Sequence, residues 1–437
     1  MKETLFQKIS AVTLEEDAPV LRDAWVLVRD GKIASVGTEE PSHGPDCEII
    51  DGTRKALLPS FVNAHTHLPM TALRGYADGV PLQSWLNDWI FPAEDRLDDR
   101  AVKASTDLAL AELLASGTTS ASDMYMFCDT IARCALDAGL KLNISRGRTC
   151  FGAFDPETLQ SVKDAEALIR DWHGAGDGRI LAELCIHGEY TSPPELWRWV
   201  ADRAAESGLG VHLHLSETES EQEACLRRWG KTPAAALAEA GVFRNRVTAA
   251  HCVWVTDEDI ALLRQSGAAA IHCPVSNAKL GSGVAPLEKL TGAGVTVALG
   301  TDGASSNDAL DLFGELKLTA LLQRAVCRDA GLIRPIDVLR MATAGGAAAQ
   351  GRAGECGKLA VGMDADLMVL DLDRPGLYPE HSLLSNLVYC ATGRDVWMTM
   401  CRGETLYKAG QWLTVDVERA AYEMEHYAAP LVSGRLR

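Results

Sequence analysis

The sequence lacks a long apolar run and is short of positive charge. No stretch of its 437 residues reaches the ~18 apolar side chains that a membrane-spanning helix needs, and the first residues already carry charge. Lysine and arginine total 42 against 60 aspartates and glutamates, a formal net charge of −18. Such an acidic surface repels phosphate backbones and anionic lipids. We therefore expect a cytoplasmic protein that binds neither nucleic acid nor membrane.

The sequence also lacks any pair of cysteines in CxxC spacing, although it contains twelve cysteines. This absence excludes a zinc ribbon and a thioredoxin motif. Scattered cysteines in a large chain without an apolar leader behave mostly as small buried hydrophobic residues. We expect free thiols and no structural disulfide.

Three regions differ in their pattern. Residues 1–58 contain short β-like runs broken by Asp-Gly turns, with a hairpin predicted for 24–36. Residues 59–352 alternate short apolar runs with amphipathic helical stretches. In residues 353–437 the β-like runs return, and a last helix is predicted for 417–428. We expect the two terminal regions to form one small β-sandwich beside a middle domain.

The middle region contains eight predicted strands. They begin near Phe61, Thr118, Lys141, Ile180, Val211, Val247, Ala268 and Val295. Because helices alternate with them, neighbouring strands should be parallel, and eight such strands close most simply into a TIM-like (β/α)8 barrel. A doubly wound open sheet is the alternative. In a barrel, the active site lies where the strands end.

Histidines and one aspartate stand at predicted strand ends. His65 and His67 end the first strand two residues apart, so both imidazoles point the same way. His214 ends the fifth strand, and Asp302 follows the eighth. These nitrogen and oxygen ligands suit one divalent metal, Zn²⁺ first and Fe²⁺ as the alternative. A metal of this kind acidifies a bound water molecule.

Three more polar residues belong to the same strand ends. His251 ends the sixth strand, close to the expected metal. Glu217 lies just past the fifth strand, where a carboxylate suits proton transfer. His212 shares the face of His214 one layer deeper, and we expect it to be a hydrogen-bonded core histidine.

This constellation resembles the amidohydrolase superfamily across the whole barrel, and the flanking sandwich also matches. Shorter motifs resemble the 5-methylthioadenosine/S-adenosylhomocysteine deaminases, to which triazine chlorohydrolases and guanine deaminases are related. The motifs lie in residues 59–67, 92–97, 214–218 and 277–283. Many amidohydrolases bridge two metals with a carboxylated lysine on the fourth strand. Residues 180–187 contain no lysine, which indicates a single metal.

The resemblance implies an aminohydrolase of the EC 3.5.4 type, which acts on the C–N bond of a cyclic amidine. Its substrate would be adenosine or a 5′-modified adenosine such as methylthioadenosine or 5′-deoxyadenosine, converted to the inosine-type product and ammonia. Glu217 would protonate the purine N1. Asp302 would contact the metal and take the water proton, and His251 would help to deliver it to the leaving amine.

The resemblance also implies substrate contacts. Glu94 would bind the ribose hydroxyls, Arg146 would lie near the 5′ substituent, and His187 would contact the substrate beside the metal. Trp85 is a candidate wall of the pocket, with plain helix packing as its alternative. The alternative for Glu94 is an exposed carboxylate favoured by the helix dipole.

The chain departs from the family pattern in the region that follows the third strand. Residues 149–163 contain no arginine for the carboxylate of S-adenosylhomocysteine, and Arg148 is the remaining candidate. This departure favours nucleosides without the amino-acid tail. Glu189, close to His187, is expected to add negative charge near the mouth.

Two other functions stay open. Guanine or a triazine is the alternative substrate, and Glu94 discriminates because a ribose-binding carboxylate has no purpose without a sugar. A non-catalytic assembly protein of this fold is the alternative outside enzymes, and it predicts broken metal ligands, whereas all of them are present. The sequence leaves the preferred 5′ group open, and both monomer and homo-oligomer are compatible with it.

Overall fold

The computed structural model describes residues 2–147 and 149–435. It contains the eight predicted barrel strands, paired in parallel in chain order, which confirms the (β/α)8 prediction. The strands are β6 (Phe61–His67), β7 (Thr118–Tyr125), β8 (Lys141–Arg146), β9 (Ile180–Ile186), β10 (Val211–Leu215), β11 (Val247–His251), β12 (Ala269–His272) and β13 (Thr296–Leu299). Among the described residues, no helix has the length and apolar content to span a membrane.

A ninth, two-residue strand closes the barrel. β14 (Asp302–Gly303) pairs with the end of β6, where Asp302 lies opposite Thr66. Gly300 separates it from β13, and a Cβ atom at this glycine would lie 2.8 Å from the Cβ of His65. Only glycine fits such a close approach. Because Gly300 has no side chain, the segment after β13 can approach β6 closely and place Asp302 next to His65 and His67.

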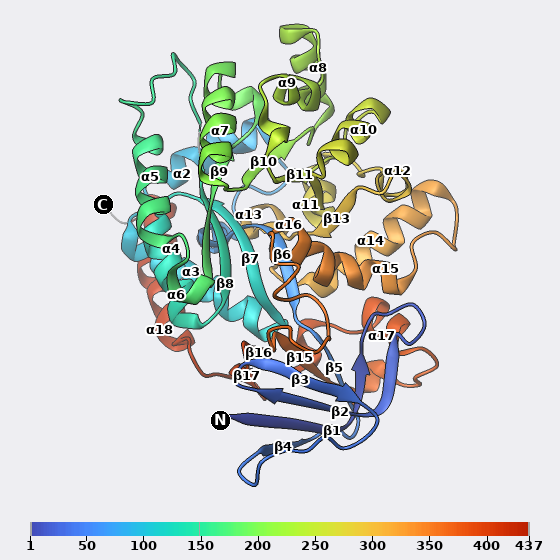
Figure 1. Cartoon of the computed structure of the whole chain (residues 1–437). Helices are drawn as coiled ribbons and strands as arrows, with labels where there is room; N and C mark the ends of the chain where they lie inside the picture. The colour runs from blue at the N-terminus through green and yellow to red at the C-terminus, as the bar shows by residue number, and fades with distance from the viewer. Residues whose placement is uncertain (1, 148, 436–437) are drawn as a thin grey trace.

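Helices surround the barrel (Figure 1). The main ones are α3 (Asp99–Ala115), α4 (Cys128–Ala138), α5 (Gln160–Trp172), α7 (Pro194–Ser207), α8 (Glu219–Trp229), α9 (Pro233–Glu239), α10 (Asp257–Ser266), α12 (Leu287–Gly292) and α14 (Leu312–Cys327). Their starts follow capping chemistry: Asp98 accepts a hydrogen bond from the amide of Ala101, and Thr256 forms a capping box with Asp259. After α14, the chain continues as α15 (Pro335–Arg340), the π-turn η5 (Met341–Gly345) and α16 (Gly346–Ala349).

The terminal segments form a second, mixed sheet below the barrel (Figure 1). Its strands are β1 (Glu3–Val12), β2 (Val20–Arg29), β3 (Lys32–Gly37), β4 (Glu48–Asp51), β5 (Lys55–Pro59), β15 (Leu367–Asp371), β16 (Val396–Cys401), β17 (Glu404–Lys408) and β18 (Gln411–Trp412). β5 joins the two halves by pairing with both β1 and β15. Phe6, Leu57 and Met400 share one core, so the N- and C-terminal segments build one small β unit as predicted, with their strands joined in a single mixed sheet. The limits 58/59 and 352/353 stay predictions.

Two smaller features complete the fold. The predicted last helix begins as α18 (Val417–Glu423) and continues as the π-turn η8 (Met424–Ala428) and α19 (Ala429–Val432), and α18 packs against α3. α17 (Leu383–Tyr389) packs on α14. All twelve cysteines are free thiols, as expected.

A network of buried charges joins the floor of the barrel to this sheet. The Lys141 ammonium at the start of β8 is fully buried and lies 2.7 Å from carboxylate oxygens of both Asp364 and Asp366. The Arg402 guanidinium adds a contact of 3.0 Å to Asp364. Arg352, also fully buried, donates to Asn143 inside the barrel. Every charge here has an opposite charge or a hydrogen-bond acceptor against it.

Candidate active site

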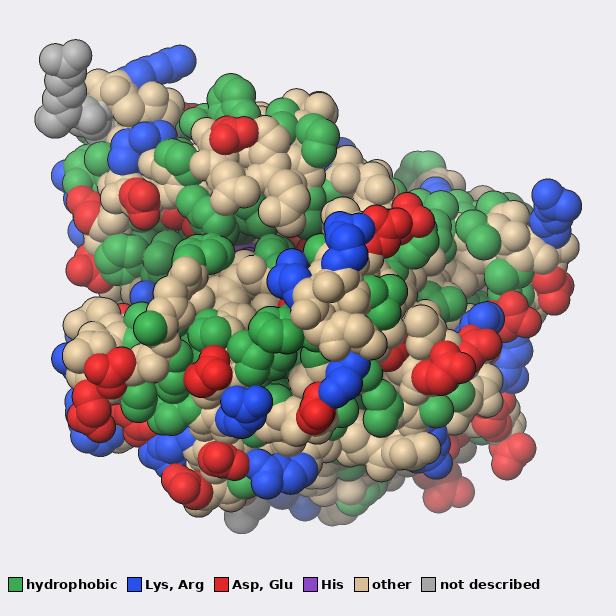
Figure 2. Space-filling view, turned by 90° about the horizontal axis from the view of Figure 1, so that it is seen from above, with side chains coloured by type: hydrophobic (Ala, Val, Ile, Leu, Met, Phe, Trp, Pro, Cys, Tyr) green, Lys and Arg blue, Asp and Glu red, His purple; other side chains and the backbone are tan. Residues whose placement is uncertain are grey.

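A cavity of about 460 Å³ opens at the carboxyl ends of the barrel strands. The surface at this end is hollowed, and hydrophobic side chains border the hollow (Figure 2). The polar residues that line the cavity include His67, His187, His214, His251 and Asp302, which stand at or just past the ends of five different strands. A cavity of this size encloses a nucleoside-sized molecule.

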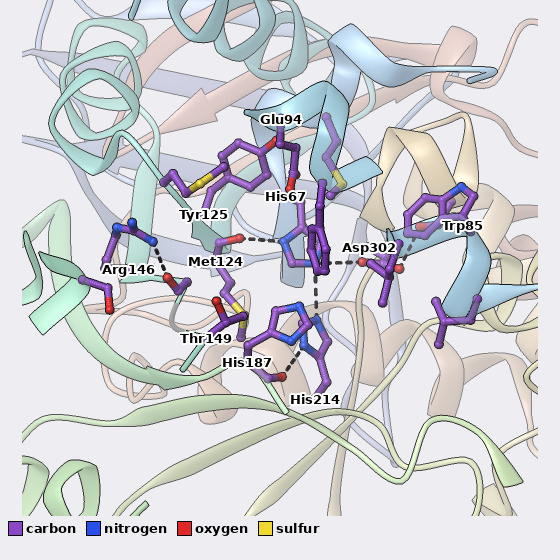
Figure 3. A pocket seen from close by; sticks show the side chains of 18 of the residues that line it. His67, Trp85, Glu94, Met124, Tyr125, Arg146, Thr149, His187, His214 and Asp302 are labelled. Atoms are coloured by element: carbon purple, nitrogen blue, oxygen red, sulfur yellow. Dashed lines mark hydrogen bonds and ion pairs between the residues drawn. The ribbon is translucent and has the colours of Figure 1, made fainter. Parts of the chain in front are cut away.

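Three of these side chains, His67, His214 and Asp302, converge on one point together with His65. The Nε2 atoms of His65 and His67 lie 3.3 and 3.2 Å from the same Asp302 oxygen, Oδ1. The Nε2 atom of His214 lies 3.3 Å from that of His67 (Figure 3). The other Asp302 oxygen accepts hydroxyl hydrogen bonds from Ser276 and Ser306, which orient the carboxylate.

The outward-facing nitrogens of the histidines are fixed by hydrogen bonds. Nδ1 of His67 lies 2.6 Å from the Met124 carbonyl oxygen, and Nδ1 of His214 lies 2.6 Å from that of His187. Because a carbonyl oxygen only accepts, both imidazoles carry their proton on Nδ1. Their Nε2 lone pairs therefore point at the common centre, which is the arrangement that metal-binding histidines adopt.

The donor set fits a divalent metal. Two overlapping groups each have their donor atoms within 4.8 Å of one another: His65 with His67 and Asp302, and His65 with His214 and His251. Nε2 of His65 is buried and has no hydrogen-bond partner among the described residues. Such an orphaned lone pair, next to a carboxylate oxygen, is costly unless a cation completes it.

The electrostatics of the cluster agree with this fit. Burial holds the pKa of His65 and of His214 well below the usual range, so both rings stay neutral. Beside Asp302, the pKa of His67 is raised to about 9 against the opposing effect of burial. Despite the burial of Asp302, the imidazoles of His65 and His67 hold the pKa of this carboxyl well below its usual value. The site thus contains an ionised carboxylate and, in His65 and His214, two neutral imidazoles, the protonation states that a metal requires, and a metal bound here would displace the proton that Asp302 favours on His67.

Backbone strain marks the same strand ends. Ser216, His251 and Asp302 adopt left-handed conformations, with φ of 48°, 74° and 62°. Residues other than glycine rarely do so, and such conformations concentrate at functional sites. His251 and Asp302 line the cavity, so the strained backbone lies where these two side chains leave the strand direction and enter it.

Glu217 lies beside this cluster. Its carboxylate accepts a hydrogen bond of 3.3 Å from the Ser282 hydroxyl and lies 3.9 Å from Nε2 of His251. Burial raises the pKa of Glu217, so this carboxyl holds a proton more readily than an exposed one. Glu221, which sequence reasoning missed, accepts the backbone amides of Ser216 and Glu217 and so fixes this turn.

One wall of the cavity comes from the segment that follows β6. This segment continues from η1 (Leu68–Leu73) through α1 (Leu82–Ser84) and the π-turn η2 (Trp85–Ile90) to α2 (Phe91–Glu94). Trp85 and Glu94 are both buried and line the cavity, so the exposed alternative for Glu94 is excluded. Burial raises the pKa of Glu94 to about 7, against the effect of the neighbouring Tyr125 hydroxyl. Figure 3 shows the side chains of Glu94 and Tyr125 next to each other near His67, with Trp85 on the other side of Asp302.

The opposite wall follows β8 and β9. Arg146 lines the cavity, and its Nε atom lies 3.2 Å from a carboxylate oxygen of Asp164 on α5, so its charge is partly neutralised. His187 also lines the cavity, and burial lowers its pKa to about 4. Arg148 lies outside the described residues.

Glu189 differs from the expectation. It lies in the short turn η3 (Glu189–Thr191), and its buried carboxylate accepts hydrogen bonds from Arg228 and from the Trp229 indole. It is not among the cavity-lining residues. The expected negative charge at the mouth is therefore wrong, because the side chain turns outward to α8.

Sequence reasoning missed further residues at the cavity. Tyr125 ends β7 and lines it, and its position at a strand end was the signal that could have found it. Ser276, on α11 (Pro274–Lys279), and Ser306, on α13 (Ala304–Asn307), hold Asp302. No pattern in the sequence distinguishes these two serines from others in turns.

Comparisons with known proteins agree with the geometry. The model of the amidohydrolase family matches residues 56–406. The chain is 39% identical to 5-methylthioadenosine/S-adenosylhomocysteine deaminase of Pelotomaculum thermopropionicum, over 99% of this chain and 100% of that protein. It is 41% identical to 5′-deoxyadenosine deaminase of Methanothermobacter thermautotrophicus, over 96% and 97%. A solved adenosine deaminase of Xanthomonas campestris with bound zinc superimposes with a TM-score of 0.92 at 32% identity, covering 99% of both chains.

Proposed function

Because the chain belongs to the amidohydrolase family, we propose that it hydrolytically deaminates 5′-modified adenosines to inosine-type products and ammonia. One observation carries the proposal. Histidines 65, 67 and 214 and Asp302 converge on one point of a cavity that also contains Glu217 and Glu94. The cavity thus combines a metal site, a proton donor and a sugar-binding carboxylate. The names of the two relatives reported above support the substrate class.

His65, His67, His214 and Asp302 would hold one divalent metal, with Zn²⁺ proposed over Fe²⁺ because the donors are mostly imidazole nitrogens. Bound zinc acidifies a coordinated water molecule and so supplies a nucleophile near neutral pH. His251 belongs to the second donor group, so it lies close enough to contact that water.

The chain's own residues then move the protons. Glu217, whose burial favours the protonated form, gives its proton to N1 of the purine, so negative charge does not build up on the ring. The Oδ1 atom of Asp302 takes a proton from the attacking water. With His251, Asp302 passes this proton to the exocyclic amine, which leaves as ammonia as its bond to C6 breaks. The remaining proton of the attacking water leaves the C6 oxygen as the carbonyl forms and returns to Glu217, which restores its protonated form.

Substrate binding is assigned to the walls. Glu94 accepts the ribose hydroxyls, Trp85 packs against the substrate, and His187 contacts it beside the metal site. Arg146 lies near the 5′ group, but because Asp164 already pairs with it, a carboxylate tail gains little there. We therefore propose that neutral 5′ groups are preferred over S-adenosylhomocysteine. The protein acts in the cytoplasm on small nucleosides, without nucleic acid or membrane, as a monomer or homo-oligomer.

The test is a rate comparison with purified, zinc-loaded protein. Adenosine, 5′-deoxyadenosine, methylthioadenosine and S-adenosylhomocysteine are supplied separately, and the loss of adenine absorbance and the release of ammonia are followed. We expect turnover of the three neutral nucleosides and slower turnover of S-adenosylhomocysteine. No turnover of any nucleoside by metal-loaded protein would contradict the proposal and favour guanine or a triazine.

A further inference from the structure

One histidine of the metal cluster has an unusual hydrogen-bond partner. His67 and His214 hold their Nδ1 protons against carbonyl oxygens, and His251 faces the amide oxygen of Asn277 at 2.9 Å. Nδ1 of His65 instead lies 2.8 Å from Nε2 of His212. A second imidazole can donate or accept, so this contact alone does not determine where the proton of His65 lies.

The surroundings of His65 indicate which of the two rings donates the hydrogen bond. Its Nε2 atom faces Oδ1 of Asp302 at 3.3 Å and belongs to both donor groups that could hold a metal. A metal needs the lone pair of Nε2, so the His65 proton must be on Nδ1. His212 must then accept through Nε2 and carry its own proton on Nδ1.

The structure around His212 favours that tautomer. His212 is completely buried on β10, and Nδ1 has no hydrogen-bond partner among the described residues. Glu183 on β9 is also buried and interacts electrostatically with His212. Its Oε1 atom accepts hydrogen bonds from Asn143 and Arg246, which keep the carboxylate ionised, while Oε2 has no partner within the described ranges. Since Nε2 of His212 faces Nδ1 of His65, Nδ1 of His212 is the nitrogen left to carry the proton, and the nearby negative charge favours a proton there.

We propose that His212 is a positioning residue that keeps the proton of His65 on Nδ1 and thereby presents Nε2 of His65 to the metal. His65, His212 and Glu183 then form a column that extends from the metal site toward the barrel floor. Outer hydrogen-bond partners of this kind orient a ligand and raise its basicity. The inference rests on the metal site proposed above.

Zinc affinity tests the column with three variants of the full chain. His212→Leu removes the acceptor, whereas His212→Gln can place its amide oxygen near the position of Nε2. His272→Leu is the matched control, because His272 is equally buried on β12 and neither of its ring nitrogens has a partner among the described residues. Affinity is measured by competition with a chromogenic chelator, and thermal unfolding reports whether each variant is folded.

We expect His212→Leu to bind zinc about 10- to 100-fold more weakly than the parent, and His212→Gln and His272→Leu to stay within about threefold. Wild-type affinity in folded His212→Leu would overturn the inference. Equal losses in the leucine and glutamine variants, or in the control, would overturn it as well. If the parent protein itself fails to bind zinc, the proposed metal site is wrong instead.

A second measurement does not depend on how the variants fold. Nitrogen-15 NMR of histidine-labelled, zinc-loaded parent protein reports the tautomer of each ring, and signals are assigned with His212→Gln. We expect His212 to carry its proton on Nδ1 alone, with Nε2 shifted as a hydrogen-bond acceptor. A proton on Nε2 of His212, or on both nitrogens, would overturn the inference.

Discussion

The two ends of the barrel both bury charged groups, but they treat them differently. At the floor, Lys141 lies between Asp364 and Asp366, and each charge has an opposite charge in contact. At the mouth, the nitrogens of several imidazoles face one another and a single carboxylate oxygen, and Glu94 is buried with no ion pair to any described residue. Buried charges that are paired with opposite charges are compatible with a stable fold. Buried polar groups without such a partner are costly and are typical of sites where a bound ligand supplies the missing interaction.

The pKa values express the same contrast. Lys141 and Lys32 contribute to lowering the pKa of Asp364 to about 2, although burial opposes them. Burial raises the pKa of Glu94 to about 7 and that of Glu221, near the cluster, to about 8. The floor therefore keeps its charge throughout the physiological range, while groups at the mouth change theirs within it.

The largest expected effect separates activity from stability at the mouth. Glu217→Gln keeps the shape of the side chain and its contact with Ser282 but removes the transferable proton. We expect kcat to fall about 10³-fold with zinc content unchanged, measured by steady-state kinetics and metal analysis. Glu355→Gln, at the floor, is the control and should retain full activity. A kcat within threefold of the parent, with zinc bound, would remove Glu217 from the mechanism.

The complementary experiment removes a charge at the barrel floor, where the expected effect is on stability and not on activity. Lys141→Met leaves Asp364 and Asp366 buried without their ammonium partner, so the free energy of unfolding should fall by about 3 kcal/mol, measured by urea denaturation. The kcat of the folded enzyme should not change. Lys289→Met, which breaks only an exposed pair with Asp257, should leave the free energy of unfolding nearly unchanged. An inactive but stable Lys141→Met protein would contradict the division between the two ends.

A third variant tests the sugar contact. Glu94→Gln should lower kcat/KM for 5′-deoxyadenosine about 30-fold at pH 8, because a hydrogen bond to a charged acceptor is lost. The same variant should turn over 2′,3′-dideoxyadenosine as fast as the parent does, since that substrate lacks the hydroxyls. Equal losses with both substrates would assign Glu94 to packing of the wall.

The smallest effect is a pH dependence of stability in zinc-free protein. The pKa of Glu94 is higher in the folded protein, about 7, than the 4.5 of the unfolded chain. The protonated carboxyl therefore stabilises the fold fully at pH values below 4.5, and this stabilisation is lost as the pH rises through about 7. Glu94→Gln cannot ionise, so relative to the parent it should gain roughly 2 kcal/mol between pH 5 and pH 8, measured by urea unfolding.

Asp364→Asn is the control for this prediction. Because the pKa of Asp364 is lowered to about 2, its contribution is lost only in acid and should be the same at pH 5 and pH 8. A pH-dependent cost for this floor variant, or none for Glu94→Gln, would contradict the contrast between the two ends.

The sequence predicted the barrel because its signals are local. Each strand is a short apolar run, and six of the eight begin at the residue expected, while β12 and β13 begin one residue later. The metal-site and proton-transfer candidates also stand at or just past strand ends, so strand assignment placed them at one mouth, whereas Glu94 and Trp85, on the helical segment after β6, came only from the resemblance. β14 escaped prediction because two residues are too few for any periodicity.

Long-range geometry could not be predicted in the same way. The contact between His65 and His212 joins residues 147 positions apart and depends on how the barrel closes. The outward turn of Glu189 depends on α8, about 40 residues downstream, where Arg228 and Trp229 accommodate it. Such features follow from packing between elements, which no local pattern encodes.

The second sheet has a consequence for biosynthesis. β5 pairs with β15, which lies roughly three hundred residues downstream, so at 5–20 residues per second the first strands wait on the order of fifteen seconds to a minute for their partner. During that interval β1, β2 and β5 expose apolar faces and an unpaired edge. A nascent chain of this protein therefore presents the surface that chaperones bind, and truncation before residue 367 should yield aggregates rather than a free barrel.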